Sequence, residues 1–307
     1  MPRPTLARIA TLAGVSKSTA AYILNGGPAH ITFSPSTRER VEAVARELGY
    51  RPNLAARATS TGRTGGIALL HADGPLSDEL LWAIHDRAAQ HGLALTLARL
   101  PDPQLADPTH VPPILATYAV DGVLVVGVRP PPDAVAAAIQ RLNIPAIRVG
   151  CPAAHDAVAT DEEAAGRELA EHLLRLGHRR QAFVAADPAD PVEARRAAGW
   201  SAALGTAGVR PRIIDVSALS EALARDDRPS ALVLADASGR GGAGWVHEKV
   251  VLAGFASRPL HLGGTVVATH VQPLIALGRA GVDQLRARIA APETRLPGLL
   301  VAGQLIV

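Results

Sequence analysis

The charged side chains of this 307-residue chain are unevenly distributed, and one end of the chain has the chemistry to bind a polyanion. Residues 1–63 contain nine Lys and Arg but only three acids, a net charge of +6, whereas the rest of the chain has a net charge of −3. A basic segment attached to a slightly acidic body is typical of a domain that meets a polyanion. The first sixty residues are therefore the first candidate functional site.

Other kinds of chemistry find little support in the residue pattern. The histidines are scattered without the spacing of metal ligands, and no local Ser/His/Asp constellation is present. The glycine-rich run 239–244 lacks the Gly-Lys-Ser/Thr ending of a nucleotide-binding loop. Cys151 is the single cysteine, which excludes an internal disulfide and fits a reducing compartment. We therefore expect no enzyme, no metal and no cofactor.

Cap and turn residues divide the basic segment into short helices. Thr5 is a suitable N-cap, and Gly14 ends the first helix after barely two turns. Ser16 can cap a second helix that runs to Asn25. Two short helices joined by a tight, glycine-containing turn predict a helix-turn-helix. A third helix is predicted over 35–48, with a serine N-cap and a proline at its first position.

A family resemblance becomes specific in two stretches: residues 12–26, LAGVSKSTAAYILNG, and residues 36–64, STRERVEAVARELGYRPNLAARATSTGRT. They resemble the DNA-binding head and hinge of the lactose-repressor (LacI) family, with caps, glycines and spacing intact. The loop 26–33 is a few residues longer than the family's commonest version. The resemblance implies a sequence-specific DNA-binding transcriptional regulator, with repression as the expected action.

By this resemblance, the second helix enters the DNA major groove with its N-terminus foremost. Lys17 and Ser18 would face base edges, where the lysine can donate to guanine O6 and N7, and Tyr22 would do so one turn later. Many family members carry an arginine in place of Tyr22, so we expect a half-site that departs from the usual family consensus. Further DNA contacts are expected from Thr5 and, to phosphates, from Ser16, Thr19 and Asn25.

Residues 53–64 resemble the family's hinge helix, which Asn53 can cap. In similar proteins a leucine of this helix wedges into the minor groove at the centre of the palindrome. Thr59 occupies the corresponding position here, and its shorter, half-polar side chain predicts a weaker kink and lower affinity. The hinge contacts are expected from Asn53, Ala56, Arg57 and Thr59.

Beyond the hinge, short apolar runs alternate with helical patterns. Strands are predicted over 66–71, 93–97, 120–127, 144–149, 181–185, 231–235 and 250–255, and helices over 77–92, 133–142, 162–176 and 192–204. This alternation predicts an α/β body with parallel, doubly wound sheets. Because the pattern repeats in tandem, two such units are expected.

Three stretches of the body carry the family likeness: VDGVLVVG (120–127), TDEEAAGRELAEHLLRLGHRRQAFVA (160–185) and ARRAAGW (194–200). They resemble a two-lobed sensor of the periplasmic-binding-protein type (type I), which implies a small, sugar-like effector in the cleft between the lobes. An arginine opposite a carboxylate suits vicinal hydroxyl groups. The expected effector contacts are Asp73, Asp161, Arg196, Asp236 and Gln272.

Two carboxylate-bearing motifs of similar sensors are missing. Asp236 is followed by Ala237 where an Asn-Asp pair is expected, and Gly254-Phe255 leads into Ala256-Ser257 instead of an Asp pair. The loss removes usual acceptors for sugar hydroxyls. A non-sugar effector or a degenerate sensor is therefore an alternative to sugar sensing.

The expected organisation is a homodimer on a pseudo-palindromic, double-stranded DNA operator. Residues 1–52 form the head, 53–64 the hinge and linker, and 65–307 the sensor. The first lobe is expected over about 65–158 and 270–292, and the second over about 159–269 and 293–307. The helices over 77–90 and 274–289 would form the two-fold interface. No uninterrupted apolar stretch could span a membrane, so we expect a cytoplasmic protein.

Two rival interpretations remain at this point. A solute-binding protein without a DNA role would share the two-lobed body but would not need the basic head. A sugar-metabolising enzyme would need a catalytic constellation that the residue pattern does not offer. Within the favoured class, the effector could either release the regulator from DNA or act as a corepressor.

Overall fold

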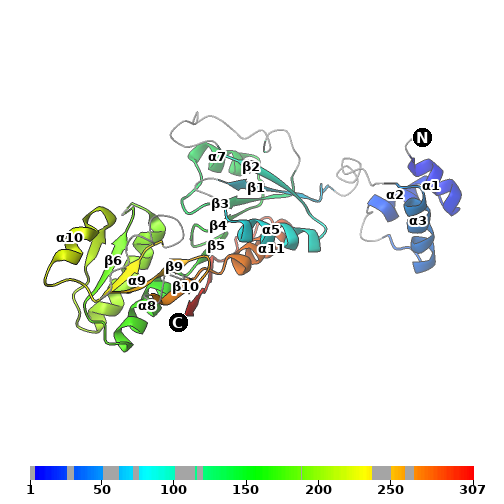
Figure 1. Ribbon diagram of the computed structural model, residues 1–307. Helices are drawn as coiled ribbons and strands as arrows, with labels where there is room; N and C mark the ends of the chain where they lie inside the picture. The colour runs from blue at the N-terminus through cyan, green and yellow to red at the C-terminus, as the bar shows by residue number, and fades with distance from the viewer. Residues whose placement is uncertain are drawn as a thin grey trace.

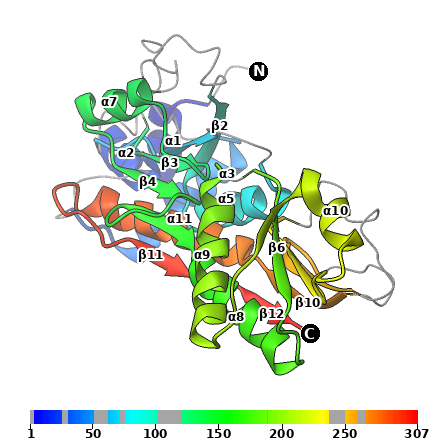
Figure 2. The ribbon, with the colours of Figure 1, turned by 90° about the vertical axis from the view of Figure 1, so that its left-hand side faces the viewer.

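The computed structural model describes residues 4–25, 31–50, 62–71, 76–100, 115, 120–187, 189–236, 250–259 and 266–307. Figures 1 and 2 show a small helical domain at the N-terminus and two α/β lobes. No helix within the described ranges is both long and apolar enough to cross a membrane. The expected contacts Asn53, Ala56, Arg57, Thr59 and Asp73 lie outside these ranges.

The N-terminal domain consists of α1 (Leu6–Ala13), α2 (Lys17–Asn25) and α3 (Pro35–Glu47). The Thr5 hydroxyl accepts a hydrogen bond from Arg8 N at 3.3 Å, and Gly14 ends α1 with a φ of 64°, which a residue with a side chain rarely adopts. Small and branched apolar residues of all three helices form one core: Ile9, Ala10, Ala13, Ala20, Ile23, Val41 and Ala45. The predicted helix-turn-helix and third helix are therefore confirmed.

The first lobe contains a parallel, six-stranded sheet in the order β11-β5-β4-β3-β1-β2. Its strands are β1 (Gly66–His71), β2 (Ala94–Arg99), β3 (Gly122–Val126), β4 (Ala146–Val149), β5 (Ala157–Thr160) and β11 (Leu299–Val301). One face packs against α5 (Asp78–Gln90) and α11 (Leu274–Ala290), and the other packs against α7 (Asp133–Arg141). Strands β1 and β3 are buried on both faces, as expected for a parallel sheet between helices.

The second lobe contains a six-stranded sheet in the order β12-β10-β9-β8-β6-β7. Its strands are β6 (Gln181–Ala185), β7 (Ile213–Asp215), β8 (Ala231–Leu234), β9 (Val251–Ala256), β10 (Val266–Val271) and β12 (Gln304–Ile306). Helices α8 (Glu162–Arg175) and α9 (Pro191–Thr206) cover one face, and η1 (Val216–Ala218) and α10 (Leu219–Ala224) cover the other. Only β12 runs antiparallel to its neighbour. The predicted pair of doubly wound sheets is confirmed.

The sheets divide the chain differently from the predicted lobe bounds at three places. Residues 159–160 complete β5 and 299–301 form β11, so both belong to the first sheet, whereas 270–271 complete β10 in the second. The cause is strand pairing over long distances in sequence, such as that of Leu299 with Val158. Five strands, β5, β7, β10, β11 and β12, were not predicted; β7, β11 and β12 have only three residues each, which is too short to carry a recognisable period.

Helices α8 and α9 approach each other backbone to backbone, and Figure 2 shows them side by side. A Cβ atom on Gly166 would overlap the carbonyl oxygen of Arg196, and one on Gly199 would overlap the carbonyl oxygen of Glu163. Only glycine permits this contact. The close crossing brings the first turn of α8 against Arg196 of α9.

We expect Gly199→Ala to lower the free energy of unfolding by about 3 kcal/mol, because the added methyl group must separate two packed backbones. Gly205→Ala in the same helix is the matched control, since no atom lies within 4 Å of its Cβ position. The control should raise stability by about 0.4–1 kcal/mol. Equal effects of the two substitutions in urea unfolding would contradict the close-contact account.

Candidate functional site

The first turn of α2 presents a cluster of donor side chains on the surface of the N-terminal domain. Lys17 and Ser18 are exposed. The Ser16 hydroxyl accepts from Thr19 N at 3.0 Å and lies 2.9 Å from Ser18 Oγ and 2.8 Å from Thr19 Oγ1. Ser16 is therefore the helix cap, and its bonds fix the neighbouring hydroxyls around the helix N-terminus. Neither α1 nor α2 has an acid in its first turn, so this end keeps its positive partial charge.

The remaining residues expected to contact DNA from the head have different surroundings. Tyr22 and Thr19 are half-buried, so each has surface within reach of a ligand. The Thr5 hydroxyl serves as the cap of α1. Asn25 is only 4% exposed, and its Oδ1 has no hydrogen-bond partner among the described residues. This burial does not support the phosphate contact that we expected from Asn25.

The second lobe buries Arg196 and binds two of its three guanidinium nitrogens. Its Nε donates to Glu162 Oε2 at 2.6 Å, and its Nη1 donates to the carbonyl oxygen of Ala235 at 2.6 Å. The guanidinium carbon lies 4.5 Å from the centroid of the Phe255 ring. Nη2 is buried without a hydrogen-bond partner among the described residues. Two of the three guanidinium nitrogens are thus occupied by the protein itself.

Three other residues expected to contact the effector, Asp161, Asp236 and Gln272, lie within the described ranges. Asp161 caps α8, where its Oδ1 accepts from Ala164 N at 3.0 Å. Asp236 is exposed after β8, and Gln272 is half-buried where the chain leaves β10. The structure instead pairs Arg196 with Glu162, which sequence reasoning missed. No local signal marks this pair, because Glu162 and Arg196 lie on different helices and meet only where α8 and α9 cross.

The carboxyl ends of the two sheets face each other, and two ion pairs join the lobes there. Arg258, which follows β9, donates to Glu79 Oε1 through Nε at 3.0 Å and through Nη2 at 2.6 Å. Glu79 lies in the first turn of α5. Arg129, which follows β3, lies 3.8 Å from Asp187, which follows β6. These pairs join loops that follow the strands of the two sheets, which is the region where ligands bind in open α/β sheets.

Neighbouring groups hold both acids of these pairs in place. The Ser77 hydroxyl donates to Glu79 Oε2 at 2.8 Å. Hydrogen bonds from Arg258 and then from Ser77 lower the pKa of Glu79 from 4.5 to about 2. In the second lobe, Glu193 Oε2 accepts from the backbone nitrogens of Ala186 and Asp187 at 2.9 and 3.2 Å, which fixes the loop that carries Asp187. Burial raises the pKa of Glu193.

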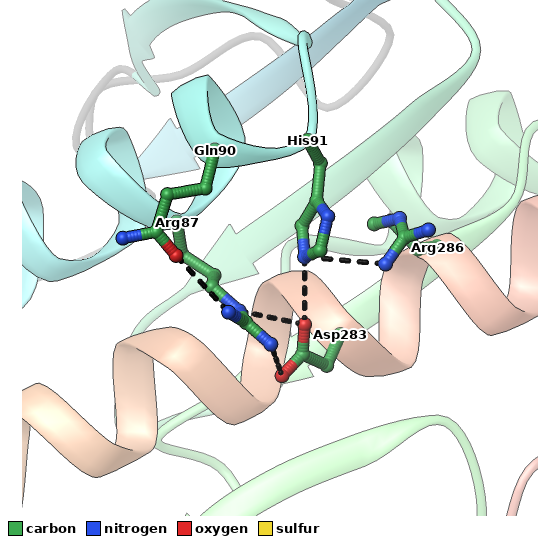
Figure 3. Close-up of polar contacts among 5 residues, drawn as sticks. All are labelled: Arg87, Gln90, His91, Asp283 and Arg286. Atoms are coloured by element: carbon green, nitrogen blue, oxygen red, sulfur yellow. Dashed lines mark hydrogen bonds and ion pairs between the residues drawn. The ribbon is translucent and has the colours of Figure 1, made fainter.

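Helices α5 and α11 share a polar cluster on the outer face of the first lobe, as Figure 3 shows. Arg87 donates to both carboxylate oxygens of Asp283 at 2.9 Å, and His91 Nε2 lies 3.1 Å from Asp283 Oδ1. Burial acts to raise the pKa of Asp283, but the bonds from Arg87 and His91 outweigh it and lower the pKa. Trp82 of α5 and Ile275 of α11 are 59% and 51% exposed. Exposed large apolar side chains on a pair of helices are typical of a protein interface.

No group of three or more His, Cys, Asp and Glu side chains that could hold a metal ion occurs among the described residues. The described parts offer binding surfaces: a positive helix terminus on the head, loops of the two lobes joined by ion pairs, and an exposed helix face. We therefore expect the chain to bind ligands at these places.

We expect Glu162→Ala to cost about 3–5 kcal/mol of unfolding free energy, because it leaves the Arg196 charge buried without its partner. Glu163→Ala is the matched control: it removes an exposed acid from the same first turn of α8. The control should cost less than about 1 kcal/mol. Chemical denaturation that ranks the two variants equally would contradict a structural role for the buried pair.

We expect the Glu79 carboxylate to titrate at about pH 2 in the folded protein. Because this pKa lies below the ordinary 4.5, the ion pair stabilises the lobe contact above about pH 4.5, and the contribution is lost as the pH falls towards 2. Carboxyl-carbon NMR should show the midpoint move back towards 4.5 in Arg258→Gln. Arg225→Gln, which breaks an exposed pair within the second lobe, should leave it unchanged. An Arg258→Gln midpoint that stays near 2 would show that the inter-lobe bond is not formed.

Comparison with known proteins agrees with this geometry. Residues 5–53 match the family described as "Bacterial regulatory proteins, lacI family", and residues 64–232 match "Periplasmic binding proteins and sugar binding domain of LacI family". The transcriptional regulator PtxS of Pseudomonas plecoglossicida is 30% identical over 70% of this chain, and CelR of Thermobifida fusca is 32% identical over 67%. These alignments cover only 64% and 63% of the two relatives' own length.

Longer alignments extend over nearly the whole chain. The maltose regulon regulatory protein MalI of Escherichia coli K12 is 27% identical, with 98% of this chain and 97% of MalI covered. The crystal structure of the lac repressor dimer bound to operator and the anti-inducer ONPF has the same fold, with a TM-score of 0.75, 23% identity, and 100% and 98% coverage. The chain therefore belongs to the LacI family of bacterial regulatory proteins.

Proposed function

We propose that this protein is a transcriptional regulator that binds a pseudo-palindromic DNA site as a homodimer. The observation that carries the proposal is the first turn of α2, where Lys17 and Ser18 are exposed at a helix N-terminus without acids. PtxS, CelR and MalI are named as regulators, and the lac repressor was crystallised as a dimer on its operator. The domain bounds 1–52, 53–64 and 65–307 are part of this proposal.

In the proposed complex, α2 lies in the major groove with its first turn against the bases. Lys17 donates to guanine O6 or N7, and the Ser18 hydroxyl contacts an adjacent base edge. Ser16 and Thr19 contact phosphates and thereby fix the position of the helix. Tyr22 replaces a bidentate donor by a phenol, so the half-site departs from the usual family consensus. The hinge contacts from Asn53, Ala56, Arg57 and Thr59, with a weak central kink, complete the proposal.

The proposed two-fold interface consists of the outer face of α5 and α11. The exposed Trp82 and Ile275 supply apolar area, and the bidentate Arg87–Asp283 pair supplies a rigid, charged surface that a second copy can complement. This arrangement places two heads on one palindrome in the cytoplasm, where the DNA is.

We further propose a small effector that binds in the inter-lobe cleft and changes the balance between open and closed lobes. A sugar is supported by the maltose regulon of MalI and by the CelR–cellobiose complex, which has a TM-score of 0.63 at 25% identity. Against an ordinary sugar site, Arg196 already binds Glu162 and Ala235 and has only Nη2 left for a ligand. A non-sugar or degenerate sensor is the second candidate that this contact set favours.

The DNA proposal is tested by selecting fragments of the source genome with the full chain at near-physiological salt. We expect an enriched pseudo-palindrome. Lys17→Ala should relax the preference at one base pair in each half-site by about 1–3 kcal/mol. Arg46→Ala, an exposed cation in the last turn of α3, is the control and should leave the base preference unchanged. Salt-sensitive binding without an enriched motif would contradict sequence-specific regulation, and the absence of any DNA binding would favour a solute-binding role.

A further inference from the structure

The Asp121 carboxylate binds residues 64 and 65, where the chain enters the first lobe. We call these contacts the clamp. Asp121 Oδ1 accepts from Thr64 N at 2.7 Å and from Thr64 Oγ1 at 3.0 Å. Asp121 Oδ2 accepts from Gly65 N at 2.8 Å. A single half-buried acid thus satisfies two consecutive backbone amides and a hydroxyl, although it lies more than fifty residues away in the sequence.

Further hydrogen bonds connect the clamp to the sheet of the first lobe. Asp121 immediately precedes β3, and its own backbone nitrogen donates to Gly66 O at 2.8 Å. The Thr64 hydroxyl also accepts from Gly66 N at 3.0 Å, so it is held from both sides. Gly65 has a φ of 70°, which a residue with a side chain rarely adopts. The direction of the chain at this point is therefore fixed by the β1–β3 pair.

A second contact ties the same point to α11. Arg63 Nη2 donates to Ile289 O in the last turn of that helix, at 3.3 Å, where a cation also complements the helix dipole. Leu285 and Ile289 pack directly on Gly122, since a Cβ atom there would lie 2.8 and 2.9 Å from their side chains. Helix α11 begins just after the chain returns from β10 of the second lobe, and Figure 1 shows it beside α5.

We propose that Asp121 is a positioning residue that fixes the direction in which the linker leaves the first lobe, and thereby sets the half-site spacing that the dimer accepts. The inference rests on the proposed DNA-binding function. Hydrogen bonds to a charged acceptor are the stronger kind, and two of them here hold backbone amides. With both linkers clamped, the two heads can occupy only half-sites at a fixed separation and rotation. With free linkers, the heads can adapt to several separations.

The experiment uses the full-length chain and the palindrome that it selects, with zero, one or two base pairs inserted at the centre. The variants are Asp121→Ala, Thr64→Ala and the conservative Thr64→Ser, which keeps the hydroxyl. Asp215→Ala is the matched control, because Asp215 also accepts from a backbone amide and a hydroxyl but lies in the second lobe. Amide hydrogen exchange at Thr64 and Gly65 measures the clamp without DNA.

In the wild type we expect protected amides at Thr64 and Gly65, and an affinity that falls at least about tenfold when the centre is lengthened. Asp121→Ala should speed exchange at both amides and flatten the spacing dependence to about twofold. Thr64→Ala should give an intermediate dependence even if Asp121→Ala fails to fold. Thr64→Ser and Asp215→Ala should keep the wild-type amide exchange and spacing dependence. A general loss of stability would not produce this difference between the variants.

Unprotected Thr64 and Gly65 amides in the wild type would overturn the clamp. A selected palindrome whose spacing dependence is unchanged in both Asp121→Ala and Thr64→Ala would overturn the positioning role and leave the proposed function intact. If the wild type selects no palindrome, the proposed function fails, and the positioning role fails with it because there is no spacing to set.

Discussion

The two lobes depend on one topological constraint: the chain passes between their sheets three times at the carboxyl ends of the strands. The passages lie at Asp161 between β5 and α8, at Gln272 and Pro273 between β10 and α11, and at 302–303 between β11 and β12. Because three neighbouring passages connect the lobes, we expect the lobes to move relative to each other by a hinge motion at these passages. The passages also bring the loops at the strand ends of the two lobes together, where Glu79 pairs with Arg258 and Arg129 pairs with Asp187.

In the second lobe, a buried ion pair has a structural role. The glycine contact between α8 and α9 brings Glu162 to Arg196, and the pair is more than nine-tenths buried. A buried pair of this kind stabilises little in itself, but loss of either partner is costly because the other charge remains. The guanidinium that was expected to bind a sugar is therefore bound by groups of the lobe itself. The carboxylates expected near it are replaced by Ala256 and Ser257, followed by Arg258, which reaches the other lobe.

Local signals in the sequence predicted much of the fold. The cap Thr5 and the left-handed Gly14 bound α1 at the expected residues. Strands that are buried on both faces, such as β3, were recognisable as apolar runs. Contacts between distant residues were not predictable, because no local pattern encodes them. The pairing of Leu299 with Val158 puts β11 in the first sheet, whereas its residues were expected in the second lobe, and the crossing of α8 and α9 pairs Arg196 with Glu162. In the head, Lys17 and Ser18 are exposed, as the predicted base contacts require, whereas the burial of Asn25 was not expected from the family likeness.

The central claim is that α2 enters the major groove of both half-sites of a palindrome. Methylation protection of the selected DNA by the full-length protein tests it most directly, because guanine N7 lies in the major groove and adenine N3 in the minor groove. The account predicts protected guanine N7 atoms placed symmetrically in the two half-sites, with loss of protection at one guanine per half-site in Lys17→Ala. Protection confined to adenine N3, or to one half-site only, would contradict it.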